Sequence, residues 1–312
     1  MKTTMRQYRF DDDYWSIRRF LREVLLANQR EQISWDVARF DYWRWHGILN
    51  VGDGTLEDDV FIWESDDGEV VAVLNPEARA SVFLQIRPDC RTLELEAEML
   101  SIAEQYLLSN IDDGRRELHV WAGSEDVSLK ELLLGRGYSR RQDGTPEHQR
   151  RRWLTEPIEA IPLVAGFLIR SVGDTDEHAA RCWVSWRAFH PDEPADHAKD
   201  SWYHNVQRAP LYRRDLDLVA VAPDGELAAF CTIWFDDVTR TGYFEPVGTA
   251  PEYRRHGLGK AILTEGFRRL RRLGADLAYV GSYSSPAHAL YASVGFETYR
   301  IQEPWYKQVT AT

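Results

Sequence analysis

A strand, a glycine-bearing loop and an amphipathic helix follow one another between residues 242 and 274, and this stretch constrains the fold more than any other. Arg254, Gly257 and Gly259 form an R-x-x-G-x-G pattern at the turn before the helix. Glycine lets a backbone approach a ligand without an intervening Cβ, and the first amides of a helix have no intrahelical partner. Those amides and the helix dipole attract anions. The stretch therefore predicts a cradle for a diphosphate group.

Two other phosphate-binding patterns fit this stretch poorly. The dinucleotide fingerprint needs three glycines and an acidic residue about 20 positions further on. Here the third glycine is displaced to Gly266 and Leu277 stands at the acidic position. The mononucleotide loop needs Ser or Thr after Gly-Lys, but Ala261 follows Lys260. An ordinary strand-to-helix turn remains as the plain alternative.

The loop resembles motif A of the GNAT N-acetyltransferase superfamily, whose Q/R-x-x-G-x-G/A loop holds the pyrophosphate of acetyl-CoA. A second match lies downstream, where Ser284–Phe296 resembles the family pattern N-x-P-A-x-x-L-Y-x-x-x-G-F. Ser284 stands where the family commonly has Asn. Tyr291 falls on the family's tyrosine, so the resemblance implies that it protonates the departing CoA thiolate. The alternative for Tyr291 is a packing aromatic on a short helix.

The resemblance also implies the remaining site residues. Glu245 lies on the strand that enters motif A, where many of these enzymes carry the general base that an ammonium group needs before it can attack a thioester. A solvated carboxylate or an anchor for the substrate amine is the alternative for Glu245. We expect the backbone around Val247 and Thr249 to pair with the pantetheine arm of acetyl-CoA. The full set of expected cofactor-binding residues is Val247, Gly248, Thr249, Arg254, Arg255, His256, Gly257, Leu258, Gly259, Lys260, Ser284 and Ala287.

Composition bounds the kind of protein. The 312 residues leave room for two domains, and no apolar run approaches the ~20 residues of a membrane span. The net charge of −12 argues against a nucleic-acid surface. The three cysteines are far apart, and His190, His197 and His204 lack the tight spacing of a zinc site, so we expect no metal. A cytoplasmic monomer or homodimer is the simple expectation, since nothing resembles a signal peptide.

The order of expected elements repeats once along the chain, with a period of about 160 residues that is too long for a solenoid repeat. We therefore predict an α+β (α/β) fold made of two tandem GNAT domains. Each domain would have a mixed, mostly antiparallel sheet flanked by helices. The expected boundaries are 1–155 for the first domain, 156–165 for a linker with two prolines, and 166–312 for the second domain.

The two halves differ at the anion-binding loop. A match without gaps places Pro88 on Pro251 and Arg91 on Arg254, and it places Glu94 and Glu96 on the two glycines. Carboxylates at a phosphate site would repel the ligand. The first domain is therefore expected to be degenerate and not to bind CoA in the usual way, while the second is expected to be catalytic.

These features predict an N-acetyltransferase that moves an acetyl or acyl group from acetyl-CoA to a primary amine, with a small molecule as the partner. Direct attack in a ternary complex is the expected route. Two alternatives stay open. One is a non-catalytic acyl-CoA sensor, and the other is a protein-interaction module in which the degenerate half is the working surface.

Overall fold

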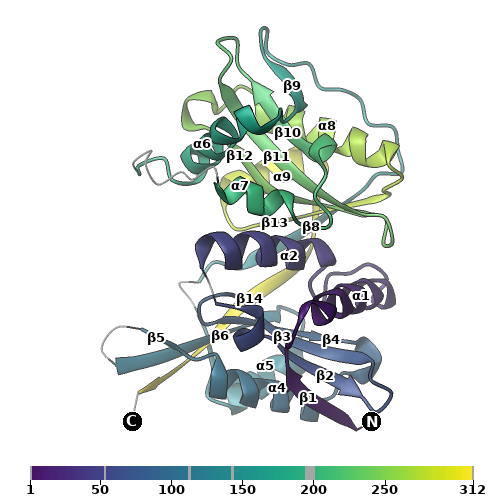
Figure 1. Ribbon diagram of the computed structural model, residues 1–312, viewed down its shortest axis with the longest axis vertical. Coiled ribbons are helices and arrows are strands. Elements are labelled where there is room, and N and C mark those ends of the chain that lie inside the picture. Colours follow the sequence, from purple (N-terminus) through teal and green to yellow (C-terminus); the bar gives the residue numbers. More distant parts are fainter. Residues whose placement is uncertain (1, 53, 112–113, 142–143, 194–200, 311–312) are drawn as a thin grey trace. The chain divides into compact units, whose positions relative to one another are not determined.

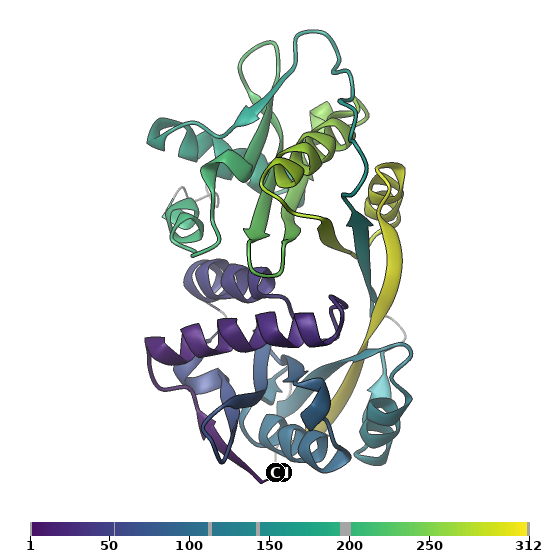
Figure 2. The same ribbon diagram turned by 90° about the vertical axis from the view of Figure 1, so that its right-hand side faces the viewer.

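The computed structural model describes residues 2–52, 54–111, 114–141, 144–193 and 201–310. The chain divides into two compact units (Figures 1 and 2). The first unit comprises residues 1–148 and 300–312, and the second comprises residues 149–299. Each unit is a mixed, mostly antiparallel sheet with helices on both faces, which confirms the predicted fold class.

The first unit has the sheet order β1-β2-β3-β4-β6-β14, with β7 paired to β14. Only β4 and β6 are parallel among its pairs of known register. Its strands are β1 (Thr3–Gln7), β2 (Phe61–Ser65), β3 (Val70–Ala78), β4 (Ser81–Ile86), β5 (Ser109–Asn110), β6 (Arg115–Gly123), β7 (Ser139–Arg140) and the end of β14 (Glu297–Thr310). Its helices are α1 (Asp11–Ala27), α2 (Val37–Tyr42), a π-helical segment (Trp43–Val51), α3 (Leu56–Asp59), α4 (Leu93–Tyr106) and α5 (Val127–Gly135).

Successive side chains of a strand point to opposite faces of the sheet, so the apolar core of this unit has two layers. Helices α4 and α5 cover one face of the sheet and α1 and α2 cover the other. Helix α2 is short, and a π-helical segment continues it. It begins only after Asp36, whose carboxylate accepts a hydrogen bond from the Arg39 amide, and it passes into the π-helical segment at Trp43. A side chain that caps the first turn in this way fixes where a helix starts.

The second unit repeats this plan with the order β9-β10-β11-β12-β13-β8. Its strands are β8 (Glu147–Trp153), β9 (Leu168–Ser171), β10 (Asp217–Val221), β11 (Leu227–Asp236), β12 (Thr241–Thr249) and β13 (Leu277–Ser282). Its helices are α6 (His178–Phe189), α7 (Ser201–Gln207), α8 (Leu258–Arg272) and α9 (Ser285–Ser293). Helices α8 and α9 pack on one face of the sheet, and α6 and α7 pack on the other.

The units are not the two continuous halves expected from the sequence. Residues 149–153 of β8 belong to the second unit, and the end of β14, drawn in yellow in Figure 2, belongs to the first. There it pairs with β6 from Gln302 to Thr310. The stretch 156–165 has no regular structure and lies within the second unit. Each half of the sequence therefore supplies one strand to the other unit, an exchange that the element order alone does not reveal.

This exchange makes the stability of the first unit depend on a residue at the far end of the chain. Trp305 is 6% exposed and packs in the same core as α4 and α5. We expect Trp305→Ala to reduce the free energy of unfolding by about 3–5 kcal/mol, the usual cost of removing a buried large aromatic side chain. Hydrogen exchange should accelerate in β6 and remain slow in β11.

Tyr306→Ala is the matched control, because the next residue of a strand points to the opposite face and Tyr306 is only half-buried. Faster exchange in β11 rather than in β6 after Trp305→Ala would contradict the assignment of this strand to the first unit.

Candidate active site

A β-bulge in β12 shapes the centre of the second unit. Cys231 lies opposite Val247, but Ile233 lies opposite Phe244, so β12 carries one extra residue between these two pairs. The bulge contains Glu245 and Pro246, and a bulge of this kind bends its strand and redirects its side chains. The buried indole of Trp234 donates a hydrogen bond to the Glu245 carbonyl oxygen at 2.6 Å, which satisfies one backbone group that the bulge displaces from the ladder.

Beyond the bulge, β12 parts from its other neighbour. The parallel pairing of β12 with β13 runs from Thr241 to Tyr243 and stops there within the described residues. On the β11 side, the Ala250 amide donates to the Ala228 carbonyl at 2.9 Å. Hydrogen-bonded and non-hydrogen-bonded pairs alternate in an antiparallel ladder. Val247 and Thr249 therefore fall on non-hydrogen-bonded positions, and their N–H and C=O groups point away from β11, toward the gap in the ladder.

The loop after β12 leads to a helix end that no side chain caps. The N-cap of α8 is Gly257, which has φ +73°, and no side chain bonds to the first turn. A Cβ built at Gly257 would meet nothing within 4 Å, so the space beside it is open. The loop side chains Arg254, Arg255 and Lys260 are exposed. The open space, the unpaired amides and the cationic side chains fit the diphosphate cradle that the sequence predicts.

Arg254 retains its charge for a ligand. Its Nε donates to the Thr249 carbonyl at 3.3 Å and an Nη donates to the Ala188 carbonyl at 3.1 Å. Both acceptors are neutral, and no carboxylate of the described residues forms an ion pair with Arg254. The guanidinium is thus held in place without being neutralised.

Several other expected cofactor residues have clear structural roles. A Cβ at Gly248 would lie 2.5 Å from the Phe230 ring, and one at Gly259 would lie 3.1 Å from Leu290, so both glycines permit close packing. Leu258 is 1% exposed in the core. His256 Nδ1 lies 3.1 Å from each of two loop carbonyl oxygens, those of Tyr253 and Arg254.

The last two expected cofactor residues, Ser284 and Ala287, lie at the start of α9. Ser284 is the N-cap of α9, and its hydroxyl accepts a hydrogen bond from the Ala287 amide. Asn and Ser both serve well at this position, so the substitution of Ser for the family's Asn preserves the cap. The expected contact of Ser284 and Ala287 with acetyl-CoA stays a prediction.

Tyr291 lies on α9 and is 8% exposed. Its ring packs edge to face against Phe296, with ring centroids 5.8 Å apart. Burial raises the pKa of the Tyr291 hydroxyl, and the nearby Cys231 and Glu245 raise it further, while Arg150 opposes them. The phenol is therefore neutral at physiological pH and can act as a hydrogen-bond or proton donor. Glu245, which is half-buried, is close enough for its charge to influence Tyr291.

Arg150 is a further member of this group that sequence reasoning missed. It lies on β8 and is 7% exposed, and its Nε donates to the Ser282 hydroxyl at 2.9 Å. Burial lowers the pKa of the Arg150 guanidinium. The available signal was a run of arginines at residues 150–152 in a strand pattern. That run belongs to the first half of the sequence, so only the strand exchange places it beside α9.

The loop before α4 in the first unit corrects the match between the two halves. Helix α4 begins at Leu93 after a 3-10 turn that starts at Pro88, whereas α8 begins at Leu258 after a turn that starts at Pro251. The loop of the first unit is thus two residues shorter. Thr92 and Glu94 occupy the positions of Gly257 and Gly259, and the expected pairing of Glu94 and Glu96 with these glycines is wrong because a gapless match ignores this deletion.

The shorter loop is closed by its own side chains. The Thr92 hydroxyl accepts a hydrogen bond from the Leu95 amide at 3.2 Å and caps α4. Arg91, in contrast to Arg254, is paired with two carboxylates, Glu96 at 2.5 Å and Asp126 at 2.5 Å. Glu96 is buried, and the remaining cavity measures about 40 Å³.

The strand edge of the first unit is occupied as well. Ile86 precedes Arg87-Pro88 as Thr249 precedes Ala250-Pro251, and the Arg87 amide bonds to Val71 as the Ala250 amide bonds to Ala228. The Ile86 amide, which points to the open side, donates to the Ser34 hydroxyl at 3.3 Å. A loop of the same unit therefore fills the place where the second unit has a gap.

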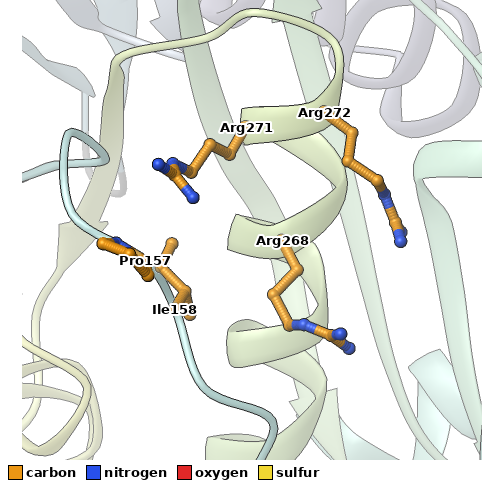
Figure 3. Close-up of a pocket in the computed structure, with 5 residues that line it drawn as sticks. All are labelled: Pro157, Ile158, Arg268, Arg271 and Arg272. Atoms are coloured by element: carbon orange, nitrogen blue, oxygen red, sulfur yellow. The ribbon is translucent and has the colours of Figure 1, made fainter.

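A cavity of about 450 Å³ lies at the other end of α8 (Figure 3). It is lined by Arg268, Arg271 and Arg272 of the helix and by the loop residues Pro157 and Ile158, and in this view only Arg271 extends toward the loop. Two of these arginines bond to Glu265 and the third donates to the Thr155 carbonyl at 3.4 Å. None of the five lining residues can serve as a general base near neutral pH, so we do not place the reaction there.

Among the described residues, no group of three or more His, Cys, Asp or Glu side chains is arranged to hold a metal ion. His197 lies outside the described residues, and the expected absence of a metal stays a prediction. No helix in the part of the chain that the structure describes is long and apolar enough to cross a membrane.

Comparison with known proteins identifies the second unit. Residues 177–296 match the sequence model of the acetyltransferase (GNAT) family. The chain is 31% identical over 190 residues to a mycothiol acetyltransferase of Salinispora arenicola, in a match that covers 57% of this chain and 59% of that relative. It is 25% identical over 253 residues to a mycothiol acetyltransferase of Thermobispora bispora, covering 78% of this chain and 81% of the relative.

Solved structures extend the likeness in fold to the whole chain. A GCN5-related N-acetyltransferase from Sphaerobacter thermophilus superposes with a TM-score of 0.68 and 17% identity, covering 98% of this chain and 95% of that structure. A tandem GNAT protein from the clavulanic acid biosynthesis pathway superposes with a TM-score of 0.66 and 15% identity, covering 98% of both chains. The whole chain is thus similar in fold to tandem GNAT proteins, and its residues 177–296 match the acetyltransferase (GNAT) family.

Proposed function

We propose that the second unit transfers an acetyl group from acetyl-CoA to a primary amine of a small molecule. The observation that carries this proposal is the continuity of two binding features along one segment. The edge of β12 at Val247 and Thr249, where the pairing with β13 has ended, leads directly to the cationic N-terminus of α8 at Gly257. An extended amide arm joined to a diphosphate, as in acetyl-CoA, has the chemistry that both features accept.

The residues of this segment would hold the co-substrate in two ways. The backbone groups of Val247 and Thr249 would bond to the pantetheine amides like an added strand. The first amides of α8, with Arg254, Arg255 and Lys260, would bind the diphosphate. Gly257 keeps the approach to these amides open because it has no Cβ. Gly248, Leu258 and Gly259 would contribute backbone contacts.

Chemistry would follow at the bulge. Glu245, directly or through a water molecule, would take the proton that the ammonium group of the acceptor must lose before attack. The amine nitrogen would then attack the acetyl carbon in a ternary complex. Tyr291 would donate to the sulfur as the C–S bond breaks. Its neutral form is the one required, and burial keeps it neutral.

The acceptor and the first unit complete the proposal. The acceptor of the mycothiol acetyltransferases is the first to test, because two of those relatives match 57% and 78% of this chain. The first unit would not bind CoA, since Thr92, Ser34 and the paired Arg91 occupy its equivalent positions. It would support the catalytic unit structurally.

Thermal unfolding with and without acetyl-CoA tests the binding site. At about 100 times its dissociation constant, the ligand should stabilise the native state by roughly 2.7 kcal/mol. In Gly257→Glu the shift should vanish, because the new carboxylate would enter the diphosphate cradle and repel the ligand.

Gly274→Glu is the matched control for this experiment. Gly274 follows α8 at its other end, and it has a similar φ of +92° and equally open surroundings. This variant adds the same charge and the same backbone strain but should keep the shift. No shift in the wild-type protein would refute acetyl-CoA binding and would favour an interaction module instead.

Substitution of the two proposed catalytic residues tests turnover. We expect Tyr291→Phe to lower kcat by about 10²-fold or more, in the range of losing one hydrogen-bond donor to a developing anion, with acetyl-CoA binding retained. Glu245→Gln should lower the rate most at neutral pH. Its defect should shrink as the pH rises, because more of the acceptor amine is then already deprotonated.

The assay follows CoA release across a panel of amines, including the acceptor of the mycothiol acetyltransferases. Acetyl-CoA binding without transfer to any amine would identify a non-catalytic sensor. Unchanged turnover in Tyr291→Phe would show that this hydroxyl is a packing group.

A further inference from the structure

Arg150 is a buried cation at the proposed reaction centre, and no family pattern in the sequence points to it. We propose that Arg150 is a catalytic residue whose guanidinium holds the departing sulfur of CoA as a thiolate, from its position on β8 beside Ser282 and Tyr291. This inference rests on the proposed function, because it assumes that CoA binds in the second unit.

Strand alternation places Arg150 on the face of the sheet where α9 lies. Residues two apart on a strand share a face, and Arg152 bonds to the Val294 carbonyl at the end of α9 and lies over the Phe267 ring of α8 at 4.5 Å. On β13, Ser282 is in phase with Ala278 and Val280, which pack in the same core as Tyr291. The hydrogen bond from Arg150 to Ser282 is consistent with this placement.

The charge of Arg150 has no counter-charge in the described part of the chain. Its one hydrogen bond found there is the bond from Nε to Ser282, and no described carboxylate forms an ion pair with it. A guanidinium has five N–H donors, and the two terminal nitrogens of Arg150 are not among the fully buried atoms of the described residues that lack a hydrogen bond, so they can reach a ligand. Arg152 offers a contrast, since it bonds to a carbonyl and stacks on a ring. An anion supplied by a ligand would satisfy Arg150.

The neighbours of Arg150 explain why such a cation is needed. The charges of Glu245, Cys231 and Arg150 shift the pKa of Tyr291. His288 Nε2 lies 3.3 Å from the Ser282 carbonyl oxygen. Burial and the first two groups raise the pKa of Tyr291 above its usual value near 10. A thiol has a pKa of about 8.5, so the phenol is the weaker acid. It can donate a hydrogen bond to sulfur, but it does not readily give up its proton.

In the acetyl transfer, the C–N bond forms and the C–S bond breaks, and the electron pair of the C–S bond moves to sulfur. Glu245 takes the first proton of the ammonium group before attack, and water takes the second proton from nitrogen as the amide forms. The sulfur leaves as a thiolate that accepts a hydrogen bond from Tyr291 and is stabilised by Arg150. It is protonated after release, so Arg150 takes part without gaining or losing a proton.

The experiment measures the thiol pKa of CoA bound to the protein, by ultraviolet absorbance of the thiolate during pH titration. In the wild-type complex we expect a pKa about 1–3 below that of free CoA, the effect of an adjacent opposite charge. Arg150→Gln should return it to the free value or above, and Arg150→Lys should keep part of the lowering. A CoA analogue that lacks the sulfhydryl group should show no such titration.

Arg152→Gln is the matched control, because it removes an arginine from the same face of the same strand and should leave the thiol pKa low. Turnover should fall by about 10²–10³-fold in Arg150→Gln, as for loss of one donor to a developing anion. CoA affinity below the thiol pKa should change little.

Each outcome decides the matter. A wild-type complex in which the thiol pKa is not lowered would overturn the role of Arg150. An equal lowering of the thiol pKa in Arg150→Gln would overturn it as well. The measurement on the wild-type complex does not depend on whether a variant folds. Absence of CoA binding to the wild-type protein would instead refute the proposed function, and this inference with it.

Discussion

The second unit depends on one irregularity, the extra residue that β12 carries at Glu245 and Pro246. Without it, the ladder with β11 would continue in register and the strand would keep its side chains on fixed faces. With it, β12 leaves β13 after Tyr243 and presents the backbone of Val247 and Thr249 along an unpaired edge. Backbone N–H and C=O groups of a strand that lack hydrogen-bond partners cost free energy when they are buried. When they are exposed, they tend to pair with other strands. A ligand with amide groups of its own is the natural partner for such an edge.

The two units show how one architecture can either keep or lose a binding site. Both have a parallel pair that stops early, a 3-10 turn and a helix that follows it. In the first unit the loop is two residues shorter, a threonine caps the helix, Ser34 occupies the strand edge, and Arg91 is neutralised by Glu96 and Asp126. In the second unit the helix end has glycine and Arg254 binds only carbonyl oxygens. These differences are local, because the sheet and its core are built alike.

Sequence reasoning was strongest where chemistry is carried by neighbouring residues. The glycine loop, the start of α9 and the position of Tyr291 could be predicted because short motifs fix backbone conformation over one or two turns. The match between the two halves was less secure, since a two-residue deletion in a loop leaves the flanking patterns intact. It placed Glu94 and Glu96 on the wrong positions, although the closed loop of the first unit is still unlike that of the second.

The sequence by itself determined the fold class, the tandem arrangement and the local form of the anion-binding loop, because periodicity, caps and glycines act within a few residues. Only the tertiary structure decided which strand belongs to which unit. Strand pairing depends on long-range contacts that no local pattern encodes, and for this reason Arg150, from the first half of the sequence, became a member of the second unit's candidate site. The same holds for Trp305, which packs in a core whose first buried residue is Phe61. The burial of Tyr291, which keeps its hydroxyl neutral, was likewise decided only by the tertiary structure.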